Sequence, residues 1–262
     1  MPQLRFFQID AFATRRFTGN PAAVMLMDAY PSDAHLQAIA AENNLAETAF
    51  IVRESTDYRL RWFTPAVEVP LCGHATLASA AAVMERLEPG REQVVFQTAS
   101  GPLTVIRPGT VYVMDFPVRP CRETEVPAGL SEALGASPIE VVWDGFNYLV
   151  RLGAPDQVRT LSPDLSAIER FDCAGVIVTA PEGSEFDFVS RYFAPAKGIP
   201  EDPVTGGAHC SLAPYWAARL GMSEFRAFQA SKRGGELVCR LKGERVELEG
   251  SCVFYLEGEA TI

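Results

Sequence analysis

"RWFTPAVEVPLCGHATLA", residues 61–78, decides the fold of this 262-residue chain because a variant of it occurs a second time. The second copy, "RYFAPAKGIPEDPVTGGAHCSLA", covers residues 191–213. Arginine, phenylalanine and proline lie at 61, 63 and 65 in the first copy and at 191, 193 and 195 in the second, and after a three-residue insertion Gly73 and Ala75 lie opposite Gly206 and Ala208. An offset of about half the chain indicates a duplicated domain rather than a solenoid of short repeats.

Both copies have the same local order: a strand, a loop, a glycine turn and a helix. The first helix is predicted over 74–87, where alanines favour helix and allow deep burial, and the second over 208–221. Pro214 lies inside the second helix and lacks a backbone N–H, so we expect a kink or a late helix start there. Strand-like stretches dominate the rest of each half.

This order predicts an α+β fold made of two pseudo-symmetric domains. Each domain is expected to pack a central helix inside a strongly curved, barrel-like β-sheet. We expect the N-terminal domain over 1–116, completed by the C-terminal strand 251–262, and the C-terminal domain over 117–250.

Composition limits the classes of function. Apolar residues make up 48% and charged residues 21%, as in an ordinary folded protein, and the net charge is −10 with a pI near 4.9. This charge argues against nucleic acid or an anionic membrane as partner. The six cysteines have no CxxC spacing, and the N-terminal stretch lacks the apolar core of a signal peptide. We therefore expect a cytoplasmic protein with free thiols.

The two glycine turns suggest how a small anion would bind. The first-turn N–H groups of a helix have no internal partner and carry the positive end of the helix dipole. Glycine at 73, 206 and 207 removes the side chain that would block a ligand. The alternative is that these are plain capping glycines. Because the whole loop is duplicated, we weigh the two interpretations equally: plain capping glycines, or a pair of turns that binds a small carboxylate from both ends.

At these residues the sequence resembles the PhzF-like phenazine-biosynthesis isomerase family, which has the diaminopimelate-epimerase-like fold. The matching stretches, taken in chain order, are "FTGNPAAV" (17–24), "LAETAFI" (45–51), "RWFTP" (61–65), "EVPLCGHATLA" (68–78) and "EDPVTGGAHC" (201–210). The resemblance implies two similar domains with the active site in the cleft between them. It also implies no cofactor and, commonly, a homodimer. We expect no metal site, because the sequence has no HxxxH or HxH spacing.

The resemblance separates two candidate bases. Epimerases of this fold use two opposed cysteines, one at each turn, whereas this chain has Cys72 at the first position and Thr205 at the second. The family places its general acid/base at Glu47, in "AETAF". An apolar setting raises the pKa of a carboxyl group towards neutrality, which suits proton transfer, although most glutamates simply face water. Alignment of "TAFIV" with "GVIVT" puts Ala174 opposite Glu47, so only one half carries the acid.

Three further polar residues are candidates for the site. His74 is expected to bind substrate or to orient Glu47. Asp202 either pairs with His74, binds a substrate amine or hydroxyl, or only shapes the loop before Pro203. Asn20 is either a turn residue or a substrate contact. His209 is expected to hold the second turn together or to fill the core.

These observations predict a cofactor-independent isomerase that moves a proton on a small carboxylate-bearing metabolite, with Glu47, His74 and Asp202 as the catalytic group. Asn20, Gly73, Gly206 and Gly207 are expected to bind the substrate. The phenazine enzyme has a serine where this chain has Gly207, which leaves the identity of the substrate open. The alternatives are a Cys72-dependent epimerase or racemase and a catalytically idle binding or scaffold protein.

Overall fold

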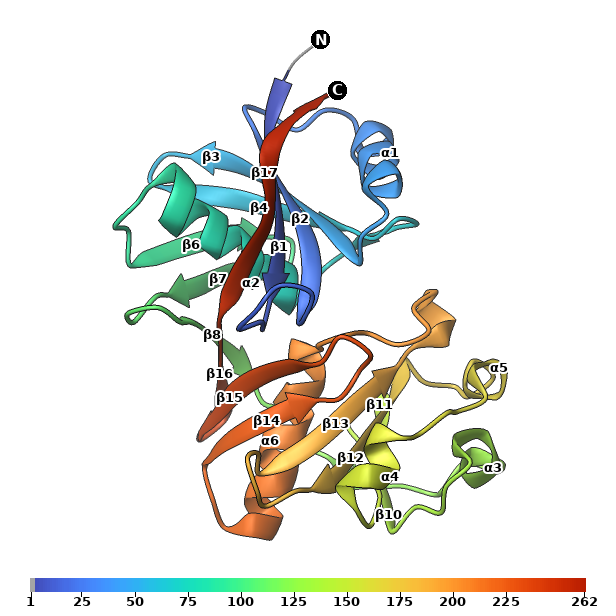
Figure 1. The fold of residues 1–262 in the computed structure, drawn as a ribbon. Coiled ribbons are helices and arrows are strands. Elements are labelled where there is room, and N and C mark those ends of the chain that lie inside the picture. The colour runs from blue at the N-terminus through green and yellow to red at the C-terminus, as the bar shows by residue number, and fades with distance from the viewer. Residues whose placement is uncertain (1–2) are drawn as a thin grey trace. The chain divides into compact units, whose positions relative to one another are not determined.

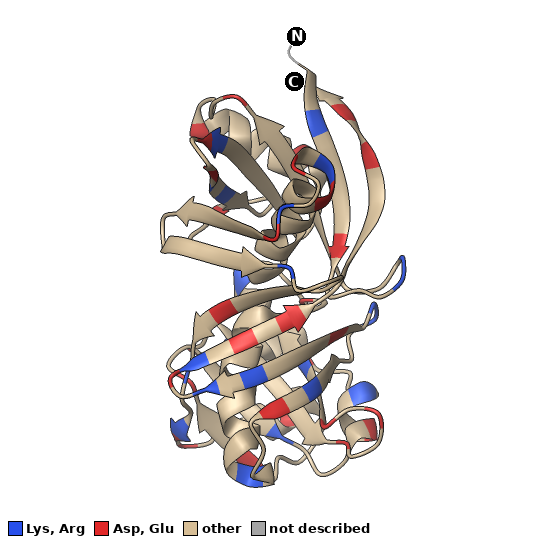
Figure 2. Cartoon of the chain, turned by 90° about the vertical axis from the view of Figure 1, so that its left-hand side faces the viewer, with Lys and Arg blue, Asp and Glu red and all other residues tan. Residues whose placement is uncertain are grey.

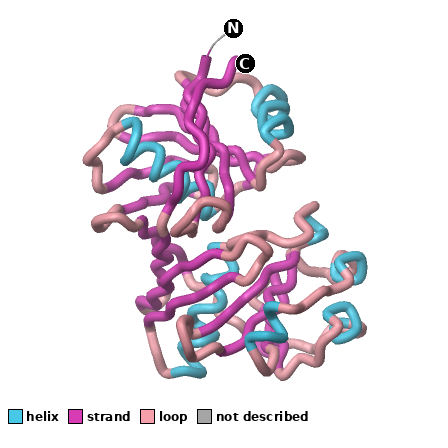
Figure 3. The backbone as a smooth tube through the Cα atoms, in the orientation of Figure 1, coloured by secondary structure: helices cyan, strands magenta, loops and turns pink. Residues whose placement is uncertain are grey.

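The structure is a computed structural model that describes residues 3–262. It divides into two compact units, Met1–Asp115 with Glu249–Ile262 (unit 1) and Phe116–Leu248 (unit 2). Short helices alternate with many strands in both units, as Figure 3 shows, so the predicted α+β class is confirmed. Among the described residues, none of the helices is long and apolar enough to cross a bilayer.

Unit 1 is a mixed sheet with a helix against it (Figure 1). Its elements in chain order are β1 (Gln3–Ala11), β2 (Asn20–Met27), α1 (Asp33–Asn43), β3 (Glu47–Glu54), β4 (Asp57–Phe63), β5 (Glu68–Val69), α2 (Gly73–Ala82), the π-helix η1 (Val83–Leu87), β6 (Gln93–Thr98), β7 (Gly101–Ile106), β8 (Tyr112–Pro117) and, at the end of the chain, β17 (Cys252–Thr261).

Unit 2 follows the same plan with more short helices. Its elements are β9 (Arg122–Glu123), α3 (Leu130–Leu134), β10 (Glu140–Trp143), β11 (Asn147–Arg151), α4 (Pro155–Arg159), α5 (Leu165–Ile168), β12 (Gly175–Pro181), β13 (Phe188–Phe193), the 3₁₀-helix η2 (Pro195–Lys197), α6 (Gly206–Leu220), β14 (Glu224–Gln229), β15 (Gly235–Lys242) and β16 (Arg245–Gly250). The chain passes between the units within β8 and again within β16.

The strand pairing repeats from one unit to the other. In unit 1 the pairs β1–β2, β2–β3, β3–β4, β4–β6 and β6–β7 are antiparallel, parallel, antiparallel, parallel and antiparallel in turn. The pairs β10–β11, β11–β12, β12–β13, β13–β14 and β14–β15 of unit 2 follow the same sequence of directions. The predicted pseudo-symmetry is therefore present in the topology and in the sequence.

Each unit buries one helix. In α2 every residue from His74 to Ala82 is buried, and the helix packs against β1, β2, β3 and β17. Alanines at five of its ten positions let the sheet approach the helix backbone closely. In unit 2 the larger side chains of α6 fill the same role, with Trp216 stacked on Phe188 at 5.9 Å between ring centroids.

The late start expected at Pro214 is wrong, because α6 runs from Gly206 through the proline to Leu220. Pro214 cannot donate to the carbonyl group four residues earlier, which belongs to Cys210. The backbone N–H of Arg119 donates to that carbonyl oxygen instead, at 2.9 Å. A neighbouring segment therefore satisfies the acceptor that the proline leaves free, and the helix continues.

Many surface charges are paired locally. Figure 2 shows Lys and Arg mixed with Asp and Glu along the strands and loops of both units. Arg61 forms a bidentate pair with Glu68, at 2.7 Å for each contact, and Lys242 pairs with Glu247 at 2.5 Å. Exposed pairs of this kind contribute little each, about 0–1 kcal/mol.

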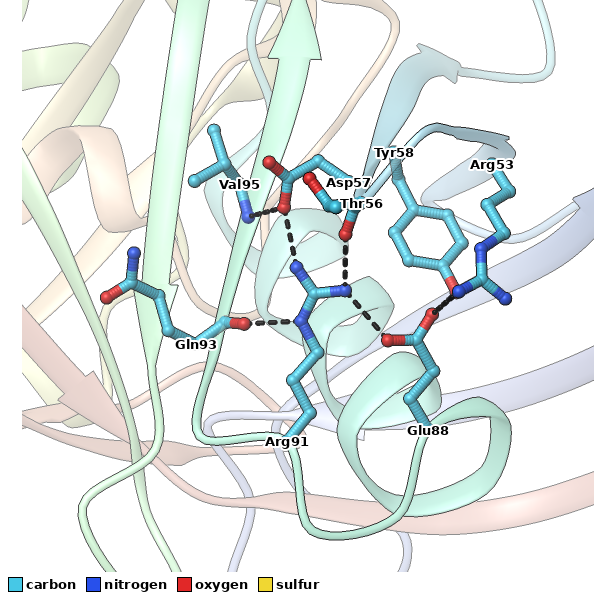
Figure 4. Close-up of polar contacts among 8 residues, drawn as sticks. All are labelled: Arg53, Thr56, Asp57, Tyr58, Glu88, Arg91, Gln93 and Val95. Atoms are coloured by element: carbon cyan, nitrogen blue, oxygen red, sulfur yellow. Dashed lines mark hydrogen bonds and ion pairs between the residues drawn. The ribbon is translucent and has the colours of Figure 1, made fainter.

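A denser polar network ties the end of the buried helix to the sheet (Figure 4). Arg91, which follows η1, donates to the carbonyl oxygen of Thr56 at 2.8 Å, to Asp57 Oδ1 at 2.6 Å and to Glu88 Oε2 at 2.8 Å. The other oxygen of Glu88 accepts from the hydroxyl group of Tyr58 at 2.7 Å. The loop after α2 and η1 is thereby fixed to the turn between β3 and β4.

We expect Arg91→Met to lower the free energy of unfolding by about 2 kcal/mol, because it leaves two partly buried carboxylates without their shared donor. Urea denaturation measures the change. Arg53→Met is the matched control: Arg53 lies 3.2 Å from the same Glu88 but its side chain is 63% exposed, so a loss below about 0.5 kcal/mol is expected. Equal losses in the two variants would contradict the network's role.

Candidate active site

The first turn of α2 is the centre of the site in unit 1. The helix begins at Gly73, after Cys72, whose backbone is extended with φ −143° and ψ 111° and whose side chain makes no capping hydrogen bond. The carbonyl oxygen of Cys72 accepts from the hydroxyl group of Thr76 at 2.6 Å, which closes the turn. The first-turn N–H groups carry the positive end of the dipole of a buried helix, where an anion is favoured.

Strand β3 brings a carboxylate to this turn. Glu47 is the first residue of β3, and its Oε2 atom lies 3.1 Å from Nε2 of His74. The two side chains are 11% and 5% exposed, so the contact is shielded from bulk water. Neither of these two atoms makes a hydrogen bond with a described residue, so the contact is a close approach of a carboxylate oxygen and a ring nitrogen rather than an aligned hydrogen bond. The carboxylate and the imidazole are therefore paired by charge and proximity.

The other edge of the imidazole ring faces β2 and the turn itself. Nδ2 of Asn20 lies 3.1 Å from Nδ1 of His74, and Sγ of Cys72 lies 3.5 Å from the same nitrogen. Asn20, the first residue of β2, is fully buried. Because an amide N–H donates to Nδ1, the proton of the neutral ring lies on Nε2, the ring nitrogen that lies 3.1 Å from Glu47. Three elements thus fix one imidazole.

Opposing effects act on the pKa of His74. Burial disfavours the charged ring, but the neighbouring Cys72 and Glu47 groups outweigh it and raise the pKa well above 6.5. Burial and Glu47 raise the pKa of the Cys72 thiol to about 11, so this thiol is uncharged at neutral pH. The carboxylate of Glu47 is therefore the group that favours the imidazolium form.

The raised pKa also bears on the chemistry open to Cys72. A thiolate, and not a thiol, acts as a base or nucleophile, and low thiol pKa values occur where the site is partly exposed and electropositive. Cys72 is buried beside a carboxylate. Its surroundings favour the neutral thiol.

Glu47, Cys72 and His74 are also the residues to consider as metal ligands. They offer donor atoms that all lie within 4.8 Å of one another. However, Cys72 contacts Nδ1 and Glu47 contacts Nε2, on different edges of the ring. One ion cannot use both contacts, so these side chains would have to move before they could form a tetrahedral site.

In unit 2 the corresponding turn is held by a glutamine. Helix α6 begins at Gly206 after Thr205, whose N–H donates to Oε1 of Gln229 at 2.8 Å. The hydroxyl group of Thr205 donates to Oδ2 of Asp202 at 2.5 Å, and Nε2 of Gln229 donates to the carbonyl oxygen of Asp202 at 2.7 Å. Sequence reasoning missed Gln229, because one glutamine at the end of a strand carries no distinctive pattern.

His209 has a structural role in the same turn. Its Nδ1 atom lies 2.8 Å from the carbonyl oxygen of Thr205, and its ring stacks on Phe188 at 6.0 Å between centroids. Burial lowers the pKa of His209 to about 4, so the ring is neutral and donates through Nδ1. The sequence left this role open beside a plain core position, and the structure combines the two.

The sheet registers identify the counterpart of Glu47 in unit 2. Phe50 pairs with Arg61 in unit 1, and Val178 pairs with Arg191 in unit 2. Since the two arginines are equivalent in the repeat, Glu47 corresponds to residue 175. The sequence alignment that placed residue 174 there is wrong by one position.

Residue 175 is a glycine with no room for a side chain. A Cβ atom at Gly175 would lie 2.7 Å from the carbonyl oxygen of Phe193 and 2.7 Å from the ring of Tyr192. An acid therefore cannot occupy this position without a rearrangement of β13. In the repeat alignment His74 likewise corresponds to Gly207, so unit 2 keeps the turn and lacks both members of the carboxylate–imidazole pair.

The structure thus places the sequence-predicted residues in two groups. Unit 1 brings together Asn20, Glu47, Gly73 and His74, with Cys72 beside them. In unit 2, Asp202 contacts Thr205 directly before the turn formed by Gly206 and Gly207.

Comparison with known proteins identifies the family of the chain. A family model described as phenazine biosynthesis-like protein matches residues 9–260. An uncharacterized isomerase of Pseudomonas aeruginosa is 50% identical over 256 residues, which is 98% of each chain. The crystal structure of a PhzF-family phenazine biosynthesis protein from Enterococcus faecalis superimposes with a TM-score of 0.96 at 41% identity, over 100% of both chains.

More distant structures share the fold alone. A hydroxyproline epimerase from Agrobacterium vitis has a TM-score of 0.64 at 11% identity, covering 99% of this chain and 91% of its own. The predicted diaminopimelate-epimerase-like architecture is therefore confirmed at the level of the fold. With the match of the family model over nearly the whole length, the chain belongs to the phenazine biosynthesis-like (PhzC-PhzF) family.

Proposed function

We propose that the protein is a cofactor-independent isomerase that moves a proton on a small carboxylate-bearing substrate, with Glu47 as the general acid and base. The observation that supports this most directly is the shielded 3.1 Å contact between Glu47 Oε2 and His74 Nε2 at the first turn of α2. Relatives of the same family are named isomerases.

In the proposed reaction a single group, the carboxylate of Glu47, both takes and returns the proton. The carboxylate of Glu47 takes a proton from a carbon atom next to the substrate's carboxylate, so that a C–H bond breaks and an O–H bond forms. The same O–H then gives the proton to another carbon atom of the substrate, and the carboxylate is restored. Because Oε2 lies against Nε2 of His74, Oε1 is the oxygen left to meet the substrate.

The negative charge that develops on the substrate needs a partner. The N–H groups of the first turn of α2, at Gly73 and His74, are donors that are fixed before the reaction starts and that favour this developing negative charge. The imidazolium form of His74 adds a positive charge beside Glu47, and its raised pKa keeps that form populated towards neutral pH.

The absence of room for an acid at Gly175 favours chemistry with one base. A racemase with two opposed bases needs a second proton-transferring group from the other half of the duplicated fold. Here the equivalent position is filled by the ring of Tyr192. We therefore favour transfer of a proton between two carbon atoms on one face of the substrate, assisted by Asp202 and by the turn at Gly206 and Gly207, with Asn20 acting through His74.

A Cys72-dependent epimerase is the second candidate, because Sγ of Cys72 lies 3.5 Å from Nδ1 of His74. The raised pKa of the thiol makes it the weaker one. We also propose that the protein works in the cytoplasm, in line with its six free cysteines, and as a homodimer.

We expect Glu47→Gln to abolish deuterium incorporation into a substrate, because the amide can neither take nor return a proton. The assay is NMR in D₂O with a panel of cyclic and unsaturated carboxylates, such as 2-cyclohexene-1-carboxylate, selected by thermal stabilisation of the wild type. Ligand binding at a hundredfold excess over Kd stabilises by about 2.7 kcal/mol, which a melting curve resolves. The variant should still bind within about tenfold. Full exchange by Glu47→Gln would refute the proposed role.

Cys72→Ala separates the second candidate from the first. We expect the variant to keep the rate of exchange within about threefold, because the thiol is protonated and serves only as a neighbour of His74. Serine at this position is a control for size and polarity. Loss of exchange in both variants, with melting temperatures unchanged, would transfer the proton chemistry to the cysteine.

The raised pKa of His74 predicts a pH dependence. The pKa of His74 is higher in the folded protein than in the unfolded chain, where it lies near 6.5. The charged imidazole of His74 therefore stabilises the folded protein fully below pH 6.5, and this stabilisation is lost as the pH rises through the folded-state pKa. The difference in unfolding free energy between wild type and His74→Asn should therefore shrink as the pH rises. In Glu47→Gln the NMR titration of His74 should move to lower pH. A His74 resonance titrating below 6.5 in the wild type would contradict the assignment.

A further inference from the structure

Arg119, in the segment between β8 and β9, differs from the paired surface arginines. It is partly buried, yet its guanidinium makes no ion pair and no side-chain hydrogen bond with any residue in the described range 3–262. Its guanidinium lies over the ring of Phe146, whose centroid is 5.2 Å from Cζ. A ring holds a cation in place without neutralising its charge.

The backbone of Arg119 is fixed to α6 by the proline in that helix. Its N–H donates at 2.9 Å to the carbonyl oxygen of Cys210, which has no helical donor because residue 214 is proline. Cys210 lies one turn after Gly206. The helix irregularity therefore anchors Arg119 beside the first turn of α6.

The guanidinium lies over Gly207. A Cβ atom at this position would be 3.4 Å from Nη1 of Arg119, so the missing side chain leaves the charged group next to the turn. Because Gly207 is the counterpart of His74, unit 2 replaces the imidazole of unit 1 with a guanidinium that comes from another segment.

We propose that Arg119 is a specificity-determining residue that binds the carboxylate of the substrate through its guanidinium, together with the N–H groups at Gly206 and Gly207. The proposal rests on the proposed function and names its substrate class: a small carboxylate held by a planar fork of N–H donors. Such a fork matches the two oxygens of a carboxylate and rejects an uncharged amide of the same shape.

The other charged groups near Arg119 fit this role. Lys197 is a second cation, with its amino group 3.5 Å from the hydroxyl group of Tyr192, and burial together with Arg119 lowers its pKa. Asp144 is occupied by four donors, the N–H groups of residues 146 and 147, the amide of residue 147 and the hydroxyl group of Ser211. Asp202 accepts from the hydroxyl group of Thr205. An incoming carboxylate relieves the repulsion between the two cations.

The test compares binding of benzoate and cyclohexanecarboxylate with binding of the uncharged benzamide. We expect the wild type to bind the two carboxylates and to ignore benzamide, as measured by calorimetry and melting temperature. Arg119→Met should weaken carboxylate binding at least tenfold, with Arg119→Lys in between because it lacks the fork. The matched control is Arg226→Met, since Arg226 also lies over a phenylalanine ring of unit 2, at 5.5 Å from Phe186. Its binding should equal that of the wild type.

Pro214→Ala tests the placement of Arg119 independently of its charge. Alanine restores the N–H that competes for the Cys210 carbonyl oxygen and favours helix more than proline does. We expect this variant to fold at least as well as the wild type and to bind the carboxylates several-fold more weakly. A purely structural role of the proline would move stability and binding in the same direction.

Equal carboxylate binding by Arg119→Met and wild type would overturn the proposal. Absence of binding of either carboxylate to the wild type would also overturn it. The probes are used at about 50 mM, which reveals Kd values of about 10 mM. These outcomes are separate from failure of the proposed function. That function fails if Glu47→Gln still exchanges protons, whatever Arg119 does. The role of Arg119 alone fails if Glu47-dependent exchange persists in Arg119→Met with unchanged affinity.

Discussion

A helix buried on all sides can present its unpaired backbone groups only at its ends, and this constraint organises both units. In α2 every residue after Gly73 is buried, so the first turn is where the polarity of the backbone reaches other groups. Cys72 makes no capping hydrogen bond with its side chain. The turn is therefore available to an anion, and the strands that enclose the helix carry Asn20 and Glu47 to it at their first residues. The candidate site at the first turn of α2 is therefore a consequence of enclosing this helix in a sheet.

Duplication supplies this geometry twice, and the two copies have diverged in chemistry. In unit 1 the turn holds a carboxylate and an imidazole 3.1 Å apart. In unit 2 the equivalent of the acid is Gly175, closed off by Tyr192 and Phe193, and the equivalent of the imidazole is Gly207. In the proposed function unit 1 moves the proton, whereas unit 2 offers donors and positive charge. This division suits a reaction with one base and an anionic substrate, because proton transfer and charge recognition place opposite demands on a site.

The sequence predicted the features that depend on periodicity and repetition. The α+β class, the duplication and both glycine turns follow from patterns of a few residues, and the motif around Glu47 is what makes this residue a candidate. The sequence did not predict which residues contact these positions, because those contacts depend on the register of the strands. A shift of one residue separates Ala174 from Gly175, and only the pairing of β12 with β13 decides between them. Gln229 and Arg119 are distant in sequence from the turn that they contact, and neither belongs to a repeated pattern.

Pro214 illustrates why a local rule can fail and still be informative. The rule that proline interrupts a helix rests on the acceptor that it leaves unpaired, four residues earlier. In α6 that acceptor, the carbonyl oxygen of Cys210, receives the N–H of Arg119, so the cost of the proline is offset and the helix continues. The same bond fixes the approach of a chain segment to the helix at the height of Gly207. A free carbonyl group in a buried helix has to find a donor, and the segment that provides it gains a defined position. The proline therefore helps to position the segment around Arg119, an effect that helix propensity alone does not describe.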